Sequence, residues 1–96
     1  MIKVVAKRYL KADTIDAYLC LAKELVDFSR REEGCIDYEL YYQEKDNLAV
    51  MIETWTDRYS LDCHLKNITA QGWPDKLNFY ADPKRSGGSE IYHKLY

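Results

Sequence analysis

The sequence predicts an α+β domain of the ferredoxin-like class, a four-stranded antiparallel sheet with both helices on one face. Segments with the two-residue period of strands and the longer period of helices follow one another in the order β-α-β-β-α-β. The ferredoxin-like arrangement is the common solution for that order, and it places the first and third strands in the middle. The length of 96 residues leaves room for one domain, residues 1–96.

The first strand and the first helix follow directly from the start of the chain. Residues Ile2–Lys11 alternate between two faces, as a strand does. Asp13 or Thr14 can cap a helix, and apolar residues recur at helical spacing from Thr14 to Glu32. Gly34 suits the left-handed backbone that often ends a helix.

A hairpin is expected next. Residues Cys35–Glu44 alternate again, residues 45–47 read Lys-Asp-Asn and form a tight turn, and Leu48–Trp55 is the returning strand. The alternation predicts that Ile36 and Tyr38 share a face. It does not show whether Tyr38 faces the helices or the opposite side of the sheet.

The remaining elements are a helix, a short helix and a last strand. Asp57 can cap the second helix, which Gly72 interrupts. Pro74 suits the first turn of a short helix over Pro74–Ala81. The final alternating segment is Ser89–Tyr96.

The third strand is apolar on both faces, and this bears on assembly. One face carries Leu48, Val50 and Ile52, and the other carries Ala49, Met51 and Trp55. A strand with two apolar faces indicates a sheet covered on both sides, and one chain has helices for one side only. The prediction is a homodimer, a dimeric barrel in which a second copy covers the bare face. The alternative is a monomer whose central strand is simply apolar.

Composition excludes several classes of function. The 14 basic and 16 acidic residues give a net charge of −2, so general nucleic-acid binding is not expected. No apolar segment is long enough to span a membrane, and the charged, alternating N-terminus is not a secretion signal. The three cysteines are expected to be reduced thiols in the cytoplasm. Nine tyrosines indicate either packing in the core and dimer interface or an aromatic pocket for a flat ligand.

Motifs for metals, phosphates and nucleophilic catalysis are absent. There is no glycine-rich phosphate loop, nucleophile elbow or zinc motif. Cys63 and His64 are neighbours on a predicted helix, so their side chains point about 100° apart and do not share a metal. We expect no metal and no cofactor.

One local constellation suggests chemistry. Glu53 and Trp55 lie on one face at the end of the third strand, Asp57 caps the next helix, and His64 lies two turns into it. Histidine is a natural general base near neutral pH, and Trp55 offers a flat apolar wall for an aromatic substrate. The alternative is a core tryptophan beside a half-buried surface histidine.

The order of elements and several short motifs resemble the antibiotic-biosynthesis monooxygenase family. The motifs are the opening I-K-V-V-A, G-C-I-D-Y-E-L at 34–40, E-T-W-T-D at 53–57, and His64 nine residues after the tryptophan. The resemblance covers residues 1 to about 66. It implies a ferredoxin-like homodimer, and the family includes cofactor-independent oxygenases that act on quinols and polycyclic phenols.

The resemblance therefore implies a monooxygenase that oxidises a quinol or polyphenol with O₂. His64 is the expected base, more important to chemistry than to stability because we expect it to be exposed or to line a cavity. The expected walls of the substrate cavity are Trp55, Tyr38, Met51 and Phe79. The alternatives are a cofactor-free isomerase and a non-catalytic dimer that binds a small ligand.

Haem degradation, found among relatives of the same fold, is disfavoured. Those relatives carry an asparagine on the first strand, where this sequence has Lys7 or Arg8. They also carry a haem-ligating histidine further along the chain, and here no histidine lies between residues 65 and 92.

Overall fold

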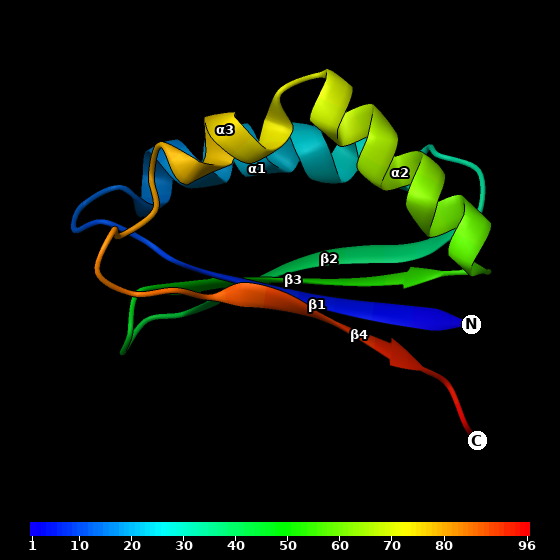
Figure 1. Cartoon of the computed structure of the whole chain (residues 1–96). Coiled ribbons are helices and arrows are strands. Elements are labelled where there is room, and N and C mark those ends of the chain that lie inside the picture. Colours follow the sequence, from blue (N-terminus) through cyan, green and yellow to red (C-terminus); the bar gives the residue numbers. More distant parts are fainter.

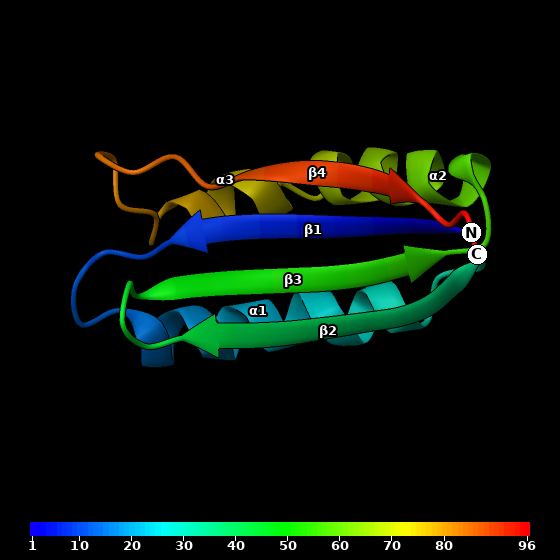
Figure 2. The same cartoon turned by 90° about the horizontal axis from the view of Figure 1, so that it is seen from below.

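The computed structural model describes residues 1–96 and consists of one sheet with its helices on one side (Figure 1). The elements in chain order are β1 (Ile2–Tyr9), α1 (Ile15–Arg30), β2 (Cys35–Gln43), β3 (Leu48–Trp55), α2 (Arg58–Ala70), α3 (Trp73–Asn78) and β4 (Gly88–His93). All strand pairs are antiparallel in the order β2-β3-β1-β4, and Figure 2 shows β1 and β3 in the middle. The predicted ferredoxin-like α+β fold is confirmed.

The strand and helix ends differ from the predictions by a few residues. The first strand stops at Tyr9 rather than Lys11, and Leu10 makes only an isolated bridge to Ala81. The last strand stops at His93 rather than Tyr96, because His93 already pairs with Ile2 at the beginning of β1. The short helix α3 spans Trp73–Asn78 instead of Pro74–Ala81.

The predicted caps are half confirmed. The Asp57 side chain accepts a hydrogen bond from the Ser60 backbone N–H at 2.8 Å and begins α2. Thr14 stands at the N-cap of α1, but its hydroxyl donates to the Lys11 carbonyl instead of capping the helix. Gly34 has φ +86°, and a Cβ there would lie 2.1 Å from Ser60 Oγ, so this turn requires glycine.

The core lies between the sheet and the helices. Its largest fully buried apolar side chains are Trp55, Tyr18, Tyr38, Leu10, Leu25 and Leu61. A register shift between Cys35 and Asp37 interrupts the pairing of β2 with β3. Ile36 is consequently 48% exposed while Tyr38 is buried beneath the helices, so the prediction that these two share a face was wrong. A bulge adds one residue to a strand and changes which face the preceding side chains occupy.

The opposite face of the sheet, which we call the outer face, has no helix over it (Figure 1). Alternate residues of β1 and β3 form the middle of this face. The cross-strand pairs are Lys3 with Thr54, Val5 with Ile52, Lys7 with Val50, and Tyr9 with Leu48. None of the helices combines the length and the apolar character that crossing a membrane requires.

Candidate functional site

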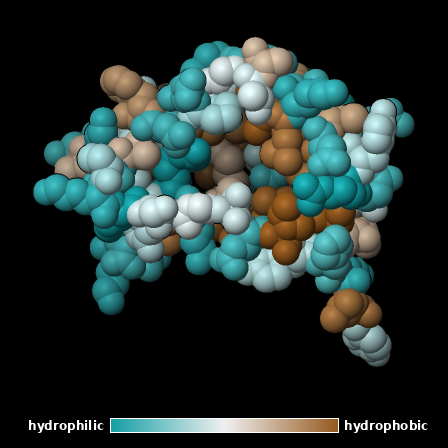
Figure 3. Space-filling view, in the orientation of Figure 1, coloured by the Kyte–Doolittle hydropathy of each residue, from teal (hydrophilic) through white to brown (hydrophobic).

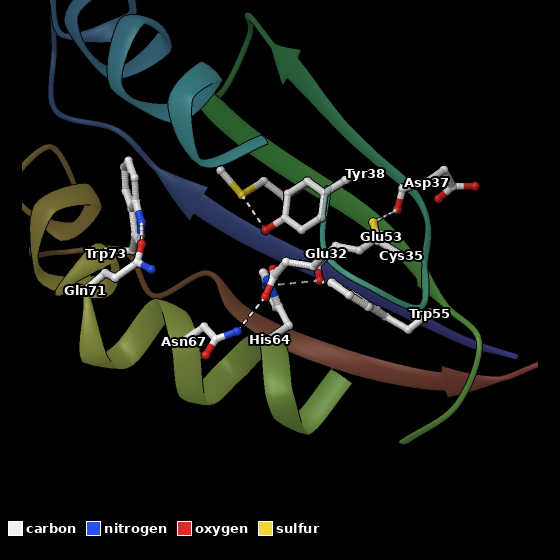
Figure 4. A network of polar contacts seen from close by, with 11 residues as sticks. Glu32, Cys35, Asp37, Tyr38, Glu53, Trp55, His64, Asn67, Gln71 and Trp73 are labelled. Atoms are coloured by element: carbon white, nitrogen blue, oxygen red, sulfur yellow. Dashed lines mark hydrogen bonds and ion pairs between the residues drawn. The ribbon is translucent and has the colours of Figure 1, made fainter. Parts of the chain in front are cut away.

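The end of β3 and the second turn of α2 bring Trp55 and His64 together. The two ring centroids are 4.5 Å apart and the ring planes are tilted by 35°. Trp55 is the last residue of β3 and points inward, and the cap at Asp57 starts α2 so that His64 faces the sheet. Figure 4 shows both rings in the layer between helix and sheet. The pairing of these two side chains was predicted from their spacing.

His64 lies between two carboxylates. Its Nδ1 is 2.6 Å from Glu32 Oε1, and its Nε2 is 3.8 Å from Glu53 Oε1. The side chain is only 1% exposed, so the expectation of an exposed or cavity-lining histidine was wrong. The physical reason is that the Glu32 carboxylate, in the turn that follows α1, satisfies the imidazole, which lets the ring pack into the core.

Glu53 is a buried carboxylate on the inner face of β3. It is 5% exposed, and one oxygen accepts a hydrogen bond from Trp55 Nε1 at 2.9 Å. Burial raises the pKa of Glu53, while the Trp55 hydrogen bond and the nearby His64 partly oppose that rise. The tryptophan therefore orients the carboxylate as well as filling the core.

Tyr38 and Met51 complete one wall of this cluster. The Tyr38 ring lies edge-on to Trp55 at 6.5 Å and to His64 at 5.6 Å between centroids. Its hydroxyl contacts Met51 Sδ at 3.6 Å. Burial, followed by the charge of Glu53, raises the pKa of Tyr38 far above its ordinary value, so the phenol stays protonated. The structure thus brings Trp55, Tyr38 and Met51 together around His64.

Phe79 does not join them. Its side chain is 70% exposed, its ring packs edge-on against Tyr80 at 5.1 Å, and Lys11 Nζ lies 5.3 Å from its centroid. Trp73 and Leu77, one helical turn apart, are the buried residues of α3. Phe79, at the end of that helix, is left outside, and its predicted place in the wall is corrected.

Glu32 and Asn67, which join the cluster in the structure, were not predicted as parts of it. Glu32 contacts His64 with one oxygen and accepts a hydrogen bond from Asn67 Nδ2 at 2.9 Å with the other. The sequence separations of 32 and 35 residues give no local signal for these contacts. Glu53 did carry a signal, because it is a carboxylate between Met51 and Trp55 on the inward face of an apolar strand.

A surface cavity of about 560 Å³ lies beside the cluster. Its lining residues are Glu32, Glu33, Gly34, Thr56, Asp57, Tyr59, Ser60, Cys63 and Asn67. His64 and Trp55 do not line it. Glu32 is the residue that both lines this cavity and contacts His64, so it connects the buried imidazole with a space large enough for a small molecule.

The arrangement is suited to moving a proton. A carboxylate–imidazole–carboxylate series can accept a proton on the imidazole and stabilise the resulting cation from both sides. No group of three or more His, Cys, Asp or Glu side chains is placed to hold a metal ion.

Comparison with known sequences gives two informative relatives. “Putative monooxygenase YcnE” of Bacillus subtilis is 32% identical over 76 residues, which are 76% of this chain and 80% of that protein. The uncharacterised protein sll1783 of Synechocystis is 34% identical over 58 residues, 59% of this chain. The chain spans only 40% of the length of that second relative.

Solved structures share the whole fold. A structure described as an antibiotic biosynthesis monooxygenase has a TM-score of 0.86 and 31% identity, with full coverage of both chains. SnoaB of Streptomyces nogalater, a cofactor-independent oxygenase solved in a mutant form, has a TM-score of 0.82 at 14% identity. That match covers 99% of this chain and 93% of SnoaB, and it concerns the fold alone.

The family model for antibiotic biosynthesis monooxygenases matches residues 1–74 of the 96. The matched segment contains the E-T-W-T-D strand end, His64 and Glu32, which together form the buried cluster. The chain belongs to the antibiotic biosynthesis monooxygenase family.

Proposed function

We propose that this protein is a cofactor-independent monooxygenase that oxidises a quinol or polyphenolic small molecule with O₂. Family membership and the buried Glu32–His64–Glu53 cluster support the proposal. The observation that carries it is the 2.6 Å contact between Glu32 and His64, because it joins a buried base to the cavity that Glu32 lines.

The chemistry needs only a deprotonated phenol. A phenolate can give one electron to O₂, and the resulting radical pair can recombine to form a carbon–oxygen bond. Loss of water then leaves a hydroxyquinone, so a hydroquinone and O₂ are converted into a hydroxyquinone and H₂O. Four electrons leave the organic substrate and reduce O₂; one oxygen atom is retained and the other becomes water. The protein must remove the first proton and hold the anion.

Each residue of the cluster has a part in that step. The substrate lies in the cavity beside Glu32, and its phenolic proton passes through the Glu32 carboxylate to His64 Nδ1. The imidazolium that forms is stabilised by Glu32 and Glu53. Trp55 and Tyr38 pack against the imidazole and keep water away from it, which strengthens these electrostatic contacts.

Oxygen uptake with a panel of hydroquinones tests the proposal. We expect wild-type protein to consume one O₂ per quinol and to place one atom of labelled O₂ in the product. Glu32→Gln should lower turnover by roughly 10²-fold or more. Glu33→Gln is the matched control, because Glu33 lines the same cavity without contacting His64. Equal turnover in the two variants would remove the Glu32–His64 pair from the mechanism.

We also propose that the active form is a homodimer packed through the outer face. That face carries half-exposed aliphatic side chains on β3, lysines on β1 and the acidic pair Asp37 and Glu39 on β2. A two-fold arrangement can place the acidic strand of one copy against the basic strand of the other. The three cysteines are free in the structure, which supports a reducing compartment such as the cytoplasm.

A second candidate function is a non-catalytic dimer that binds a small aromatic ligand. The observation that favours it is the almost complete burial of His64, at 1% exposure, which is also the pattern of a structural histidine. Ligand binding without oxygen uptake across the quinol panel would select this candidate.

A further inference from the structure

A second cavity, of about 380 Å³, lies at the far end of β1 beneath α3. Its lining comes from three parts of the chain: the end of β1, Asn78 with Ala81, and residues 85–89 before and within β4. The backbone of Gly87 packs closely against β1 at the edge of the cavity, since a Cβ there would lie 2.0 Å from the Lys7 carbonyl oxygen. Figure 3 shows the molecular surface hollowed between the helices and the sheet on the β4 side.

Arg8 is the distinctive residue of this cavity. It lies half-buried on the inner face of β1, opposite Ala49. Its Nε donates to Asn78 Oδ1 at 3.0 Å and its Nη1 to the Tyr18 hydroxyl at 3.4 Å, and both partners are neutral. Nη2 has no protein acceptor, and no carboxylate forms an ion pair with this guanidinium. A partly buried charge without a counter-charge is unfavourable unless a ligand supplies one.

The other charges around the cavity do not neutralise Arg8. None of the lining residues is acidic. Asp82, which follows the lining residue Ala81, forms its ion pair with Arg85 at 3.0 Å. Arg85 also donates to the Asp46 carbonyl and lies 4.7 Å from the centre of the Tyr9 ring, so its position is fixed by the protein alone. Lys7 also lines the cavity, but it is exposed and belongs to the outer face of β1. Arg8 is therefore the half-buried lining cation on the inner face that has no carboxylate partner.

We propose that this cavity is a carboxylate-binding site and that Arg8 holds the anion. The planar guanidinium matches the two oxygens of a carboxylate, and the cavity volume suits a ligand of one or two rings. Ala6, on the same inner face as Arg8, and Ala81 supply apolar surface to a ring. Arg8 lies four residues along β1 from Val4, which pairs with Glu53. The backbone of Arg8 is therefore about 13 Å along the strand from the residue that pairs with Glu53, and none of Glu32, His64 and Glu53 lines the cavity.

The test compares 2,5-dihydroxybenzoate with its methyl ester, two compounds that differ in one negative charge. Binding to full-length wild-type protein is measured by calorimetry at constant ionic strength. We expect the acid to bind at least about 10-fold more tightly than the ester. Arg8→Gln should abolish that difference, Arg8→Lys should keep part of it, and Lys66→Gln, which removes an exposed charge on α2, should leave it unchanged.

Several results would overturn the proposal. They are equal binding of acid and ester, no binding of the acid at millimolar concentration, an Arg8→Gln variant that still prefers the acid, or an equal loss in Lys66→Gln. If Arg8→Gln does not fold, the acid–ester comparison on wild-type protein decides. Oxygen uptake measured on the same samples keeps the two proposals apart: charge-dependent binding without turnover supports the carboxylate site and counts against the monooxygenase.

Discussion

Each face of β3 carries an exception to the usual rule that apolar side chains are buried and charged ones exposed. On the inner face Ala49, Met51, Glu53 and Trp55 are all at most 5% exposed, so a carboxylate is buried there. On the outer face Leu48, Val50 and Ile52 are only partly buried. Buried polar groups and exposed apolar groups are the informative exceptions in a folded protein. Here the buried carboxylate favours a catalytic role for the inner face, and the partly exposed aliphatic side chains favour packing of the outer face against a second copy of the chain.

The buried charge on the inner face is tolerated because it has partners. Glu53 receives the Trp55 N–H, and His64 lies between Glu53 and Glu32. Breaking one partner of such a network leaves the others unsatisfied, which costs more than the network contributes as a whole. Single substitutions on the inner face should therefore lower the free energy of unfolding much more than substitutions on the outer face.

The largest effect is expected for Trp55→Ala. The change removes a fully buried ring and the hydrogen bond to Glu53, and should lower the free energy of unfolding by about 3–5 kcal/mol. Urea unfolding followed by circular dichroism measures this directly. A loss below about 1 kcal/mol would mean that the ring is not part of the packed core.

His64→Ala should act on both stability and turnover. Because the ring is buried and bonded to Glu32, we expect a loss of about 2–3 kcal/mol in unfolding free energy. That exceeds the loss of about 1 kcal/mol expected for an exposed histidine. Turnover should fall by roughly 10²–10⁴-fold. Melting temperature and oxygen uptake are measured on the same samples, and a stability loss with unchanged turnover would assign His64 a structural role.

Ile52→Glu tests the outer face. A new charge beside Leu48 and Val50 on the outer face of β3 should convert the dimer into a monomer at micromolar concentration while leaving each chain folded. Ile91→Glu is the control, since Ile91 is an exposed aliphatic residue on the inner side of β4, away from the proposed interface. Light scattering after size-exclusion chromatography gives the masses. A dimeric Ile52→Glu, or a monomeric wild type, would contradict the proposed interface.

The pH dependence of stability distinguishes the buried carboxylate from ordinary ones. The folded-state pKa of Glu53 is raised by burial, so its favourable contribution is complete below its ordinary pKa and is lost as the pH rises through the raised value. As the pH rises above the ordinary glutamate pKa of about 4.3, wild type should therefore lose stability relative to Glu53→Gln. Unfolding curves of both proteins across that range measure the difference. A wild type that instead gains stability relative to Glu53→Gln as the pH rises would show that His64 and Trp55 outweigh burial.

The smallest effect is expected for Phe79→Ala. The side chain is 70% exposed and lies outside the cluster, so the unfolding free energy should change by about 0.5 kcal/mol or less. Quinol turnover should not change. A loss of turnover comparable to that of His64→Ala would restore Phe79 to the substrate wall and contradict its observed placement.

The fold could be predicted from the sequence because each element carries its own periodicity. The alternation in β1, β2 and β3 and the cap at Asp57 are local signals, and the topology follows from their order. The bulge before Tyr38 was not predictable, because it depends on how β2 pairs with β3 rather than on the pattern within β2.

The candidate site was predictable only where its residues are close in sequence. Trp55 and His64 are nine residues apart and joined by a capped turn, so their contact followed from local structure. Glu32 reaches His64 from the turn between α1 and β2, and the sequence gives no local measure of that distance. Phe79 was misplaced because the orientation of a short helix is set by its buried residues, Trp73 and Leu77.

The attachment of α2 has a consequence for the motions of the molecule. Only Leu61 and His64 are buried on that helix, whereas α1 buries Tyr18, Ala22, Leu25, Val26 and Ser29. A segment with few buried apolar contacts opens at a lower free energy than the whole chain. The amide hydrogens of α2 should therefore exchange with solvent before those of α1 and β3. Each such opening briefly exposes the imidazole, giving a ligand of the neighbouring cavity a kinetic route to a group that is closed at rest.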